Sequence, residues 1–174
     1  MKGIVFLVVA VLAGSATAQW LETTIHLPDS LGGVLGPSCL AYSTTDNTIY
    51  VGGGSMGGVI AVDGATNQRI ARIPTGWSAE ALCHNSTDNK VYCANRGGGN
   101  VTVIDGATDS VIATVTADQG PLALCYNVMS NKVYCANDGG GNVTVIDGAA
   151  DTVVATVAGG GGVLCYNKTN NKVY

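Results

Sequence analysis

The sequence predicts an all-β protein in which four-stranded antiparallel sheets repeat like the blades of a propeller. The phrase Asn-Lys-Val-Tyr occurs three times, with a weaker copy Asn-Thr-Ile-Tyr, at residues 89–92, 131–134, 171–174 and 47–50. The tyrosines that end these phrases are 42, 42 and 40 residues apart, and an Asp-Gly pair keeps the same period at Asp63, Asp105 and Asp147. Repeats of this length are typical of propellers and solenoids, because one unit cannot bury its apolar face without neighbours.

The N-terminal residues have the pattern of a secretory signal peptide. Lys2 supplies a positive charge, residues 4–12 form an apolar run, and residues 16–18 are a small-residue cleavage site. The alternative is a buried first strand, and the run is too short for a membrane span. We expect residues 1–18 to be removed. The mature protein would then lie in the periplasm, outside the cell or at the cell surface, with no membrane span.

The charge balance excludes one class of partner. The chain has 8 Lys and Arg against 12 Asp and Glu, so its net charge is −4. Proteins that bind nucleic acid or an anionic membrane present an excess of basic side chains. We therefore expect no nucleic-acid partner.

Each repeat divides into four short runs with the composition of β-strands. In the third repeat these runs cover residues 122–126, 132–137, 142–147 and 152–157. Val, Ile, Thr and Tyr dominate them, and apolar positions roughly alternate. Turn-forming Gly, Asn and Asp residues separate the runs. No segment after the signal peptide has the pattern of an amphipathic helix.

Two long segments resemble the YVTN family of β-propeller repeats. They are NKVYCANRGGGNVTVIDGATDSVIATV at 89–115 and NKVYCANDGGGNVTVIDGAADTVVATV at 131–157. The family pattern is a strand ending in Ala-Asn or Thr-Asn, a Gly-rich turn, Val-x-Val-Ile-Asp and a valine-rich strand. Cys93 and Cys135 depart from it, because the family usually has an aliphatic residue there. The resemblance covers nearly all of 37–174 and implies blades with strands A to D from the axis outward, at 37–73, 79–115, 121–157 and, in part, 163–174.

The repeat pattern is incomplete at both ends of the chain. Residues 21–27 resemble a stray D strand, which in many propellers completes the last blade. The sequence stops at Tyr174, inside the phrase that elsewhere continues with Cys-Ala-Asn. We expect an open or incomplete ring and a chain that is part of a longer protein, whose next residue is cysteine. A dimer that completes the ring is the less favoured alternative. An open break would leave an exposed strand edge.

The cysteines occupy patterned positions that indicate two disulfides. An A–B hairpin centred on residue 88 places Cys83 opposite Cys93, and the next repeat places Cys125 opposite Cys135 in the same way. Directly opposed strand residues come close to the separation that a disulfide needs. The alternative is paired, buried, reduced thiols, and Cys39 has no partner in this scheme. The same register opposes tyrosines across the hairpins, at Tyr42 and Tyr50, Tyr126 and Tyr134, and Tyr166 and Tyr174.

No set of residues has the spacing of a catalytic, metal or cofactor site. The chain has only two histidines, His26 and His84, and neither belongs to a metal-ligand pattern. His84 replaces a repeat tyrosine, so we interpret it as structural. The repeated Asp-Gly pairs are interpreted as turns, since a turn residue recurs wherever its turn recurs. We expect no catalytic residue, no metal and no cofactor.

Candidate binding residues lie where the repeats differ. The B–C and D–A loops share one face of a propeller, and Arg96 in one repeat is replaced by Asp138 in the next. Trp77 and Glu80 have no counterparts in the other repeats. An exposed Trp beside charged groups is typical of a ligand anchor. The alternative, in which Trp77 covers the end of a blade, is the plainer one.

The leading functional hypothesis is a secreted, non-enzymatic propeller that presents a rigid face for binding or surface association. Its ligand would be a protein, a glycan or a small molecule. A second hypothesis is a propeller enzyme, similar to lactonases or quinoprotein dehydrogenases, whose active site lies in blades outside this sequence; it rests on fold analogy alone. A third is a structural repeat protein of the cell envelope or surface layer.

Overall fold

The computed structural model describes residues 36–54, 57–160 and 162–174. The predicted signal peptide and the strand expected at 21–27 lie outside the described residues. Within them, every regular element is a β-strand. The predicted all-β fold class is therefore confirmed.

Three consecutive four-stranded antiparallel sheets form the protein, and we call them blades 1, 2 and 3. Blade 1 consists of β1 (Pro37–Ser43), β2 (Thr48–Gly53), β3 (Val59–Asp63) and β4 (Arg69–Ile73). Blade 2 consists of β5 (Ala79–Asn85), β6 (Lys90–Asn95), β7 (Asn100–Asp105) and β8 (Ser110–Thr116). Blade 3 consists of β9 (Pro121–Asn127), β10 (Lys132–Asn137), β11 (Asn142–Asp147) and β12 (Thr152–Ala158). A two-stranded hairpin follows, made of β13 (Tyr166–Asn167) and β14 (Lys172–Val173).

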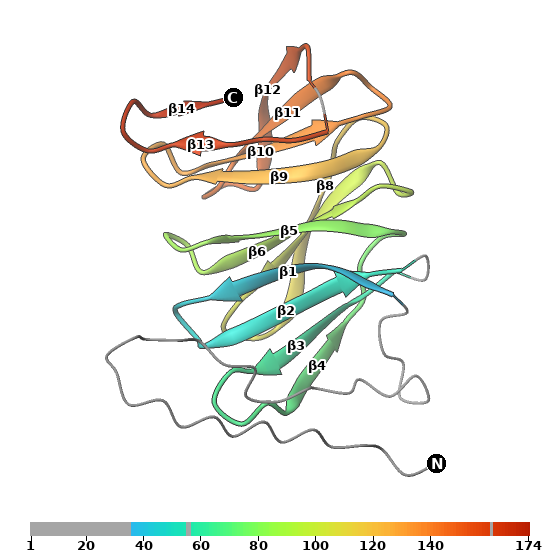
Figure 1. The fold of residues 1–174 in the computed structure, drawn as a ribbon, viewed down its shortest axis with the longest axis vertical. Helices are drawn as coiled ribbons and strands as arrows, with labels where there is room; N and C mark the ends of the chain where they lie inside the picture. The colour runs from blue at the N-terminus through green and yellow to red at the C-terminus, as the bar shows by residue number, and fades with distance from the viewer. Residues whose placement is uncertain (1–35, 55–56, 161) are drawn as a thin grey trace, which may run out of the picture.

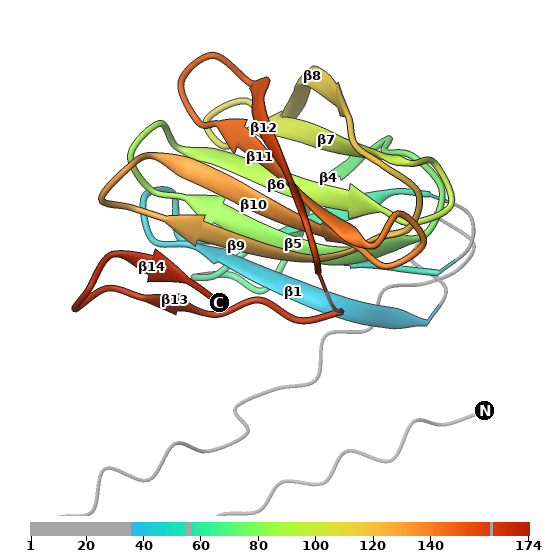
Figure 2. The ribbon, with the colours of Figure 1, turned by 90° about the horizontal axis from the view of Figure 1, so that it is seen from above.

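The blades are stacked face to face, and their first strands lie side by side (Figure 1). Strand β5 contacts both β1 and β9, and the hairpin strand β13 continues the series beside β9. Seen from above, along the stack, the blades overlap one another (Figure 2). The first strand of each blade is thus the inner strand of an open propeller, and the fourth strand is the outer one.

Two apolar cores lie between the blades. We call the side of a blade that packs on the following blade its front face, and the side that packs on the preceding blade its rear face. The first core joins the front face of blade 1 to the rear face of blade 2, with Tyr50, Val59, Ala61 and Ile73 against Leu82, Val91, Cys93 and Ile104. The second core repeats this arrangement 42 residues later, with Tyr92, Val101, Val103 and Val115 against Leu124, Val133, Cys135 and Ile146. Alternate residues of one strand face opposite cores because the side-chain period of a strand is two.

Buried tyrosines join each blade to the outer turn of the next. The hydroxyl of Tyr50 in β2 donates a hydrogen bond to Oδ1 of Asp109 in blade 2, at 2.7 Å. Tyr92 in β6 makes the same bond to Asp151 in blade 3, also at 2.7 Å. The second bond has a neighbouring ion pair, in which Nζ of Lys90 lies 2.8 Å from Asp151. Polar contacts between blades thus recur every 42 residues, as the apolar contacts do.

The repeated Asp-Gly pairs form the C–D turns, as expected. The carboxylate of Asp105 accepts hydrogen bonds from the backbone N–H groups of Ala107 and Thr108, at 3.0 and 2.8 Å. A Cβ on Gly106 would lie 2.7 Å from Oδ1 of Asn89, so this close approach of two turns requires glycine. The C–D turn is in this way fastened to the A–B turn of its own blade.

The predicted register of the A–B hairpins is wrong by one residue. Strand β5 pairs Cys83 with Tyr92 and Leu82 with Cys93. Asn89 adopts a positive φ of 52°, which Asn tolerates better than most residues, and the loop between the paired Asn85 and Lys90 therefore has four residues. The hairpin centre lies between residues 87 and 88. Adjacent strand positions point to opposite faces, so this shift places Cys83 and Cys93 on opposite sides of the sheet.

The same shift separates the tyrosine pairs that the predicted register opposed. Tyr50 lies opposite Ala41, and Tyr42 lies opposite Ile49. The partner of Tyr126 is Val133, and that of Tyr166 is Val173. Each hairpin therefore presents one aromatic ring to its front face and the other to its rear face.

Candidate functional site

The D–A loops and the B–C loops meet at one end of the blades. Backbone hydrogen bonds join the loop before blade 2 to that blade's own B–C loop: Arg96 N–H donates to the Ser78 carbonyl at 2.9 Å, and Gly97 N–H to the Trp77 carbonyl at 3.1 Å. Blade 3 repeats the first bond between Asp138 and Gly120, at 2.9 Å. We call the surface formed by these loops the loop face. All four candidate binding residues, Trp77, Glu80, Arg96 and Asp138, belong to it or adjoin it.

Trp77 projects from the loop face. Its side chain is 71% exposed, the highest value among the aromatic residues of the described chain. Hydrogen bonds hold the loop that carries it: the Trp77 and Ser78 carbonyls accept from the B–C loop, and the Ser78 hydroxyl donates to Oε1 of Glu80 at 2.9 Å. The Trp77 indole is therefore exposed to solvent on a hydrogen-bonded backbone. Glu80 helps to hold the loop that carries Trp77.

Arg96 and Asp138 form an ion pair that connects two blades. The guanidinium Nη2 lies 3.1 Å from Oδ2 of Asp138, and both side chains are half-exposed. Exposed pairs of this kind contribute at most about 1 kcal/mol to stability. The pair places one cation and one anion on the loop face.

A fifth residue of the loop face, Asp118, was not predicted from the sequence. Oδ2 of Asp118 accepts a hydrogen bond from Nδ2 of Asn142 at 2.6 Å. This bond holds the pKa of the Asp118 carboxyl below its ordinary value, and the carboxylate remains exposed. The sequence could have indicated Asp118 only through its position in a D–A loop that differs between repeats.

No group of three or more His, Cys, Asp or Glu side chains among the described residues is placed to hold a metal ion. Nε2 of His84 lies 3.3 Å from both Ser43 Oγ and Asn89 Oδ1. The tyrosine at the equivalent position of blade 3, Tyr126, bonds the equivalent Asn131. His84 thus contacts Asn89 in the same way as Tyr126 contacts Asn131. This contact agrees with the interpretation of His84 as a structural residue.

The candidate disulfide cysteines lie between blades, and their thiols are free. Cys93 lies in the first core, against which Cys39 packs, and Cys135 lies in the second, against which Cys83 packs. Cys125 sits on the front face of blade 3 and faces the hairpin. The one-residue shift in register removes the geometric basis for bonds within the hairpins. Burial raises the pKa of Cys39 to about 11 and those of Cys93 and Cys135 to about 12, so these thiols stay protonated.

The blade architecture defines the class of protein: the chain is a β-propeller segment. Among solved structures it is similar to hydrazine synthase of Kuenenia stuttgartiensis, with a TM-score of 0.72 and 18% identity over 87% of this chain and 43% of that chain. It also resembles the structure of U3-55K, with a TM-score of 0.65 and 15% identity over 74% of this chain and 41% of that chain. The WD40 repeats of RRP9 are similar to the same degree, with a TM-score of 0.65 and 16% identity over 74% and 40%.

The chain spans less than half the length of each of these structures, and such low identities establish the fold alone. No family model matches the sequence, and no curated protein matches it. Within the described ranges, no helix is long and apolar enough to cross a membrane.

Proposed function

We propose that this protein is a secreted, non-enzymatic propeller of the YVTN type that acts as a binding scaffold through its loop face. The observation that carries the proposal is Trp77, a large apolar side chain that is exposed on a backbone fixed by hydrogen bonds. Secretion is supported by the pattern of residues 1–18, and the family by the repeats at 89–115 and 131–157.

Three features of the loop face favour binding over a purely structural role. Trp provides a large contact area at a low cost in conformational entropy, and it is enriched among residues that dominate interface energies. The half-exposed ion pair of Arg96 and Asp138 supplies a cation and an anion on the same loop face. Asp118 adds a carboxylate that stays ionised. Such a surface suits a polar ligand with one flat apolar side, such as a sugar ring or an aromatic side chain of a protein.

Tryptophan fluorescence tests the proposal, because the chain has only two tryptophans, Trp20 and Trp77. A Trp20→Phe variant leaves Trp77 as the sole reporter. Titration with soluble cell-wall oligosaccharides and with aromatic peptides should change its emission for one of the two classes. Trp77→Ala should then weaken binding, measured by calorimetry, by roughly 30-fold, which corresponds to about 2 kcal/mol for an interface hot spot.

The matched control is Ile112→Ala on β8, which removes another exposed apolar side chain away from the loop face. It should leave binding unchanged. Binding that is insensitive to Trp77→Ala and Arg96→Ala, or affected equally by the control, would place the ligand elsewhere and refute the role of the loop face.

A further inference from the structure

The C–D turns of the three blades share a dipeptide with a specific chemical reactivity. Each turn begins with Asp-Gly, at residues 63–64, 105–106 and 147–148. In such a sequence the glycine nitrogen can attack the aspartate side chain, because glycine has no Cβ to obstruct the approach. The product is isoaspartate, in which the main chain runs through the side-chain carboxyl and is longer by one methylene group. The repeat therefore presents the same reactive pair three times.

The attacking nitrogen is held alike in all three turns. Each glycine N–H donates a hydrogen bond to the backbone carbonyl of an asparagine in the A–B turn of its own blade. The distance is 2.8 Å in every case, for Gly64 to Asn47, Gly106 to Asn89 and Gly148 to Asn131. The nitrogen thus does not distinguish one turn from another.

The attacked carboxylate is held by three hydrogen bonds in blades 1 and 2. Oδ1 of Asp105 accepts from the N–H groups of Ala107 and Thr108, and from the Thr108 hydroxyl at 2.9 Å. Oδ1 of Asp63 has the same three kinds of partner, and the Thr66 hydroxyl donates to it at 3.0 Å. These bonds direct the carboxylate toward residues two and three positions ahead. It must leave them before its Cγ can meet the nitrogen of the adjacent glycine.

The turn of blade 3 lacks the third of these bonds. Alanine replaces the threonine at position 150, so this position has no hydroxyl to donate. Oδ1 of Asp147 accepts from the N–H groups of Ala149 and Ala150, at 3.0 and 2.9 Å. Both bonds lie at the surface, where water is available. The carboxylate of Asp147 is therefore the most easily released of the three.

We propose that Asp147–Gly148 is the site at which the folded chain forms isoaspartate. The Gly148 nitrogen attacks Cγ of Asp147 and forms the new C–N bond of a succinimide ring. One carboxyl oxygen leaves as water, with the proton of the amide and a second proton taken from solvent. Water then opens the ring: attack at the former main-chain carbonyl gives isoaspartate, and attack at the former side-chain carbonyl restores aspartate. The reaction needs no enzyme, oxidant or cofactor.

Isoaspartate at this position would disturb the junction between blades 2 and 3. The carbonyl of Gly148 accepts hydrogen bonds from the Tyr92 hydroxyl at 3.2 Å and from Lys90 Nζ at 2.9 Å. A Cβ added to Gly148 would lie 2.5 Å from Oδ1 of Asn131 and 2.6 Å from Nδ2 of Asn85, so the turn has no space for an additional methylene group. A longer main chain therefore moves the Gly148 carbonyl away from its donors in blade 2. The loop face lies at the opposite ends of the strands, so this inference is independent of the proposed ligand.

The rate of succinimide opening at each Asp-Gly pair tests the proposal. The full chain is kept at physiological pH and temperature in heavy-oxygen water, so that each opened ring gains a heavy oxygen that peptide mass spectrometry detects. We expect labelling at Asp147 to be roughly 2- to 10-fold faster than at Asp105 or Asp63, the ratio that one hydrogen bond supplies. In urea the turns are lost, and the three rates should become equal.

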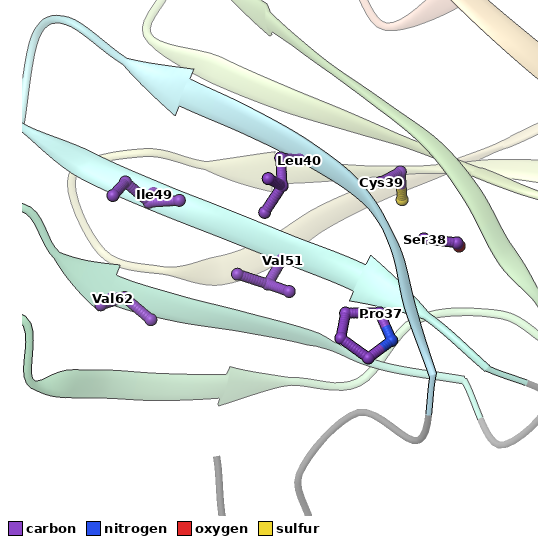
Figure 3. A pocket seen from close by; sticks show the side chains of 7 residues that line it. All are labelled: Pro37, Ser38, Cys39, Leu40, Ile49, Val51 and Val62. Atoms are coloured by element: carbon purple, nitrogen blue, oxygen red, sulfur yellow. The ribbon is translucent and has the colours of Figure 1, made fainter. Parts of the chain in front are cut away.

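Two reciprocal substitutions isolate the contribution of the hydroxyl. Ala150→Thr supplies the missing donor and should slow labelling at Asp147 by the same factor, whereas Thr108→Ala should accelerate labelling at Asp105. Both positions are exposed, so circular dichroism should show a folded chain in each variant. Leu40→Ala, in the apolar pocket of about 520 Å³ on the rear face of blade 1 (Figure 3), is the control outside the turns and should change none of the three rates.

Equal or absent labelling at the three sites of the folded chain would overturn the proposal, as would a rate at Asp147 that Ala150→Thr leaves unchanged. A faster rate at Asp147 that persists in urea would assign the difference to the local sequence and would also refute it. The isoaspartate form, separated by chromatography, should unfold at a lower urea concentration than the unmodified chain. An unchanged midpoint would contradict the effect on the junction between blades 2 and 3.

Discussion

The thiols of Cys93 and Cys135 are buried between blades, where an ionised sulfur would lose its hydration. Burial is the main cause that raises their pKa to about 12 in the folded protein. In the unfolded chain a thiol ionises near pH 8.5. These two cysteines are therefore inert in the native state and become reactive only where the blades separate.

This difference in pKa predicts a loss of stability in mild alkali. A group whose pKa is higher in the folded state stabilises that state fully below its unfolded pKa and loses this contribution as the pH rises above it. Between pH 8.5 and 11 the free energy of unfolding should fall by roughly 1.4 kcal/mol per pH unit for each such thiol. Urea unfolding at a series of pH values measures this slope. Cys93→Val and Cys135→Val copy the residue that blade 1 has, Val51, and should flatten it; an unchanged slope would contradict the assignment.

Strand β6 shows how one element serves two neighbours. Its front-face residue Tyr92 reaches blade 3 through Asp151 and the carbonyl of Gly148, at 2.7 and 3.2 Å. Its rear-face residue Cys93 packs on blade 1. The alternation along a single strand thus links three blades, and a change on one face leaves the other contact in place.

Tyr92→Phe should weaken the junction between blades 2 and 3 without opening a cavity. The variant keeps the ring and removes a buried hydrogen bond to a carboxylate, which stabilises proteins by about 1.5–3 kcal/mol. The urea midpoint should fall accordingly. Tyr166→Phe is the control, since its exposed hydroxyl bonds only Asn171 within its own hairpin and its loss should cost less than about 0.5 kcal/mol. Equal effects of the two substitutions would show that the bond between blades contributes nothing.

The strands could be predicted from the sequence because the alternation of apolar residues and the turn residues that mark them lie within a few positions of one another. The runs predicted in the third repeat differ from β9 to β12 by at most one residue at each end. The A–B register was not readable, because it depends on whether Asn89 and its equivalents adopt a positive φ, and this choice changes the loop by one residue. That single residue decided which face each cysteine occupies.

At the scale of the whole molecule, residues that recur in every repeat were interpreted as structural. Few residues differ between repeats, and only these remained as candidates for binding. The repeat correctly assigned the Asp-Gly pairs to turns and located the loops that differ. It did not reveal the bonds from Tyr50 and Tyr92 to the following blade, since these join residues 59 positions apart whose types are common in strands and turns. Asp118 was missed for a similar reason, because its partner Asn142 lies in the next blade.

The stack of blades gives the loop face its rigidity. The D–A loops before blades 2 and 3 are bonded to the B–C loops that follow them, and the three blades contact one another through their inner strands and through the bonds of Tyr50 and Tyr92. A ligand at Trp77 would therefore meet a surface whose geometry is set before binding, which lowers the entropic cost of association. The proposed function depends on this continuity between blades.

Thiol labelling followed by peptide mass spectrometry tests that continuity most directly. The native chain at pH 8 is exposed to iodoacetamide, and labelling of each cysteine is followed over time. We predict rapid labelling of the exposed Cys165, and labelling of Cys93 and Cys135 only when denaturant separates the blades. Rapid native labelling of Cys93 and Cys135, or their recovery as disulfides with Cys83 and Cys125, would contradict the packing of blade on blade described for this protein.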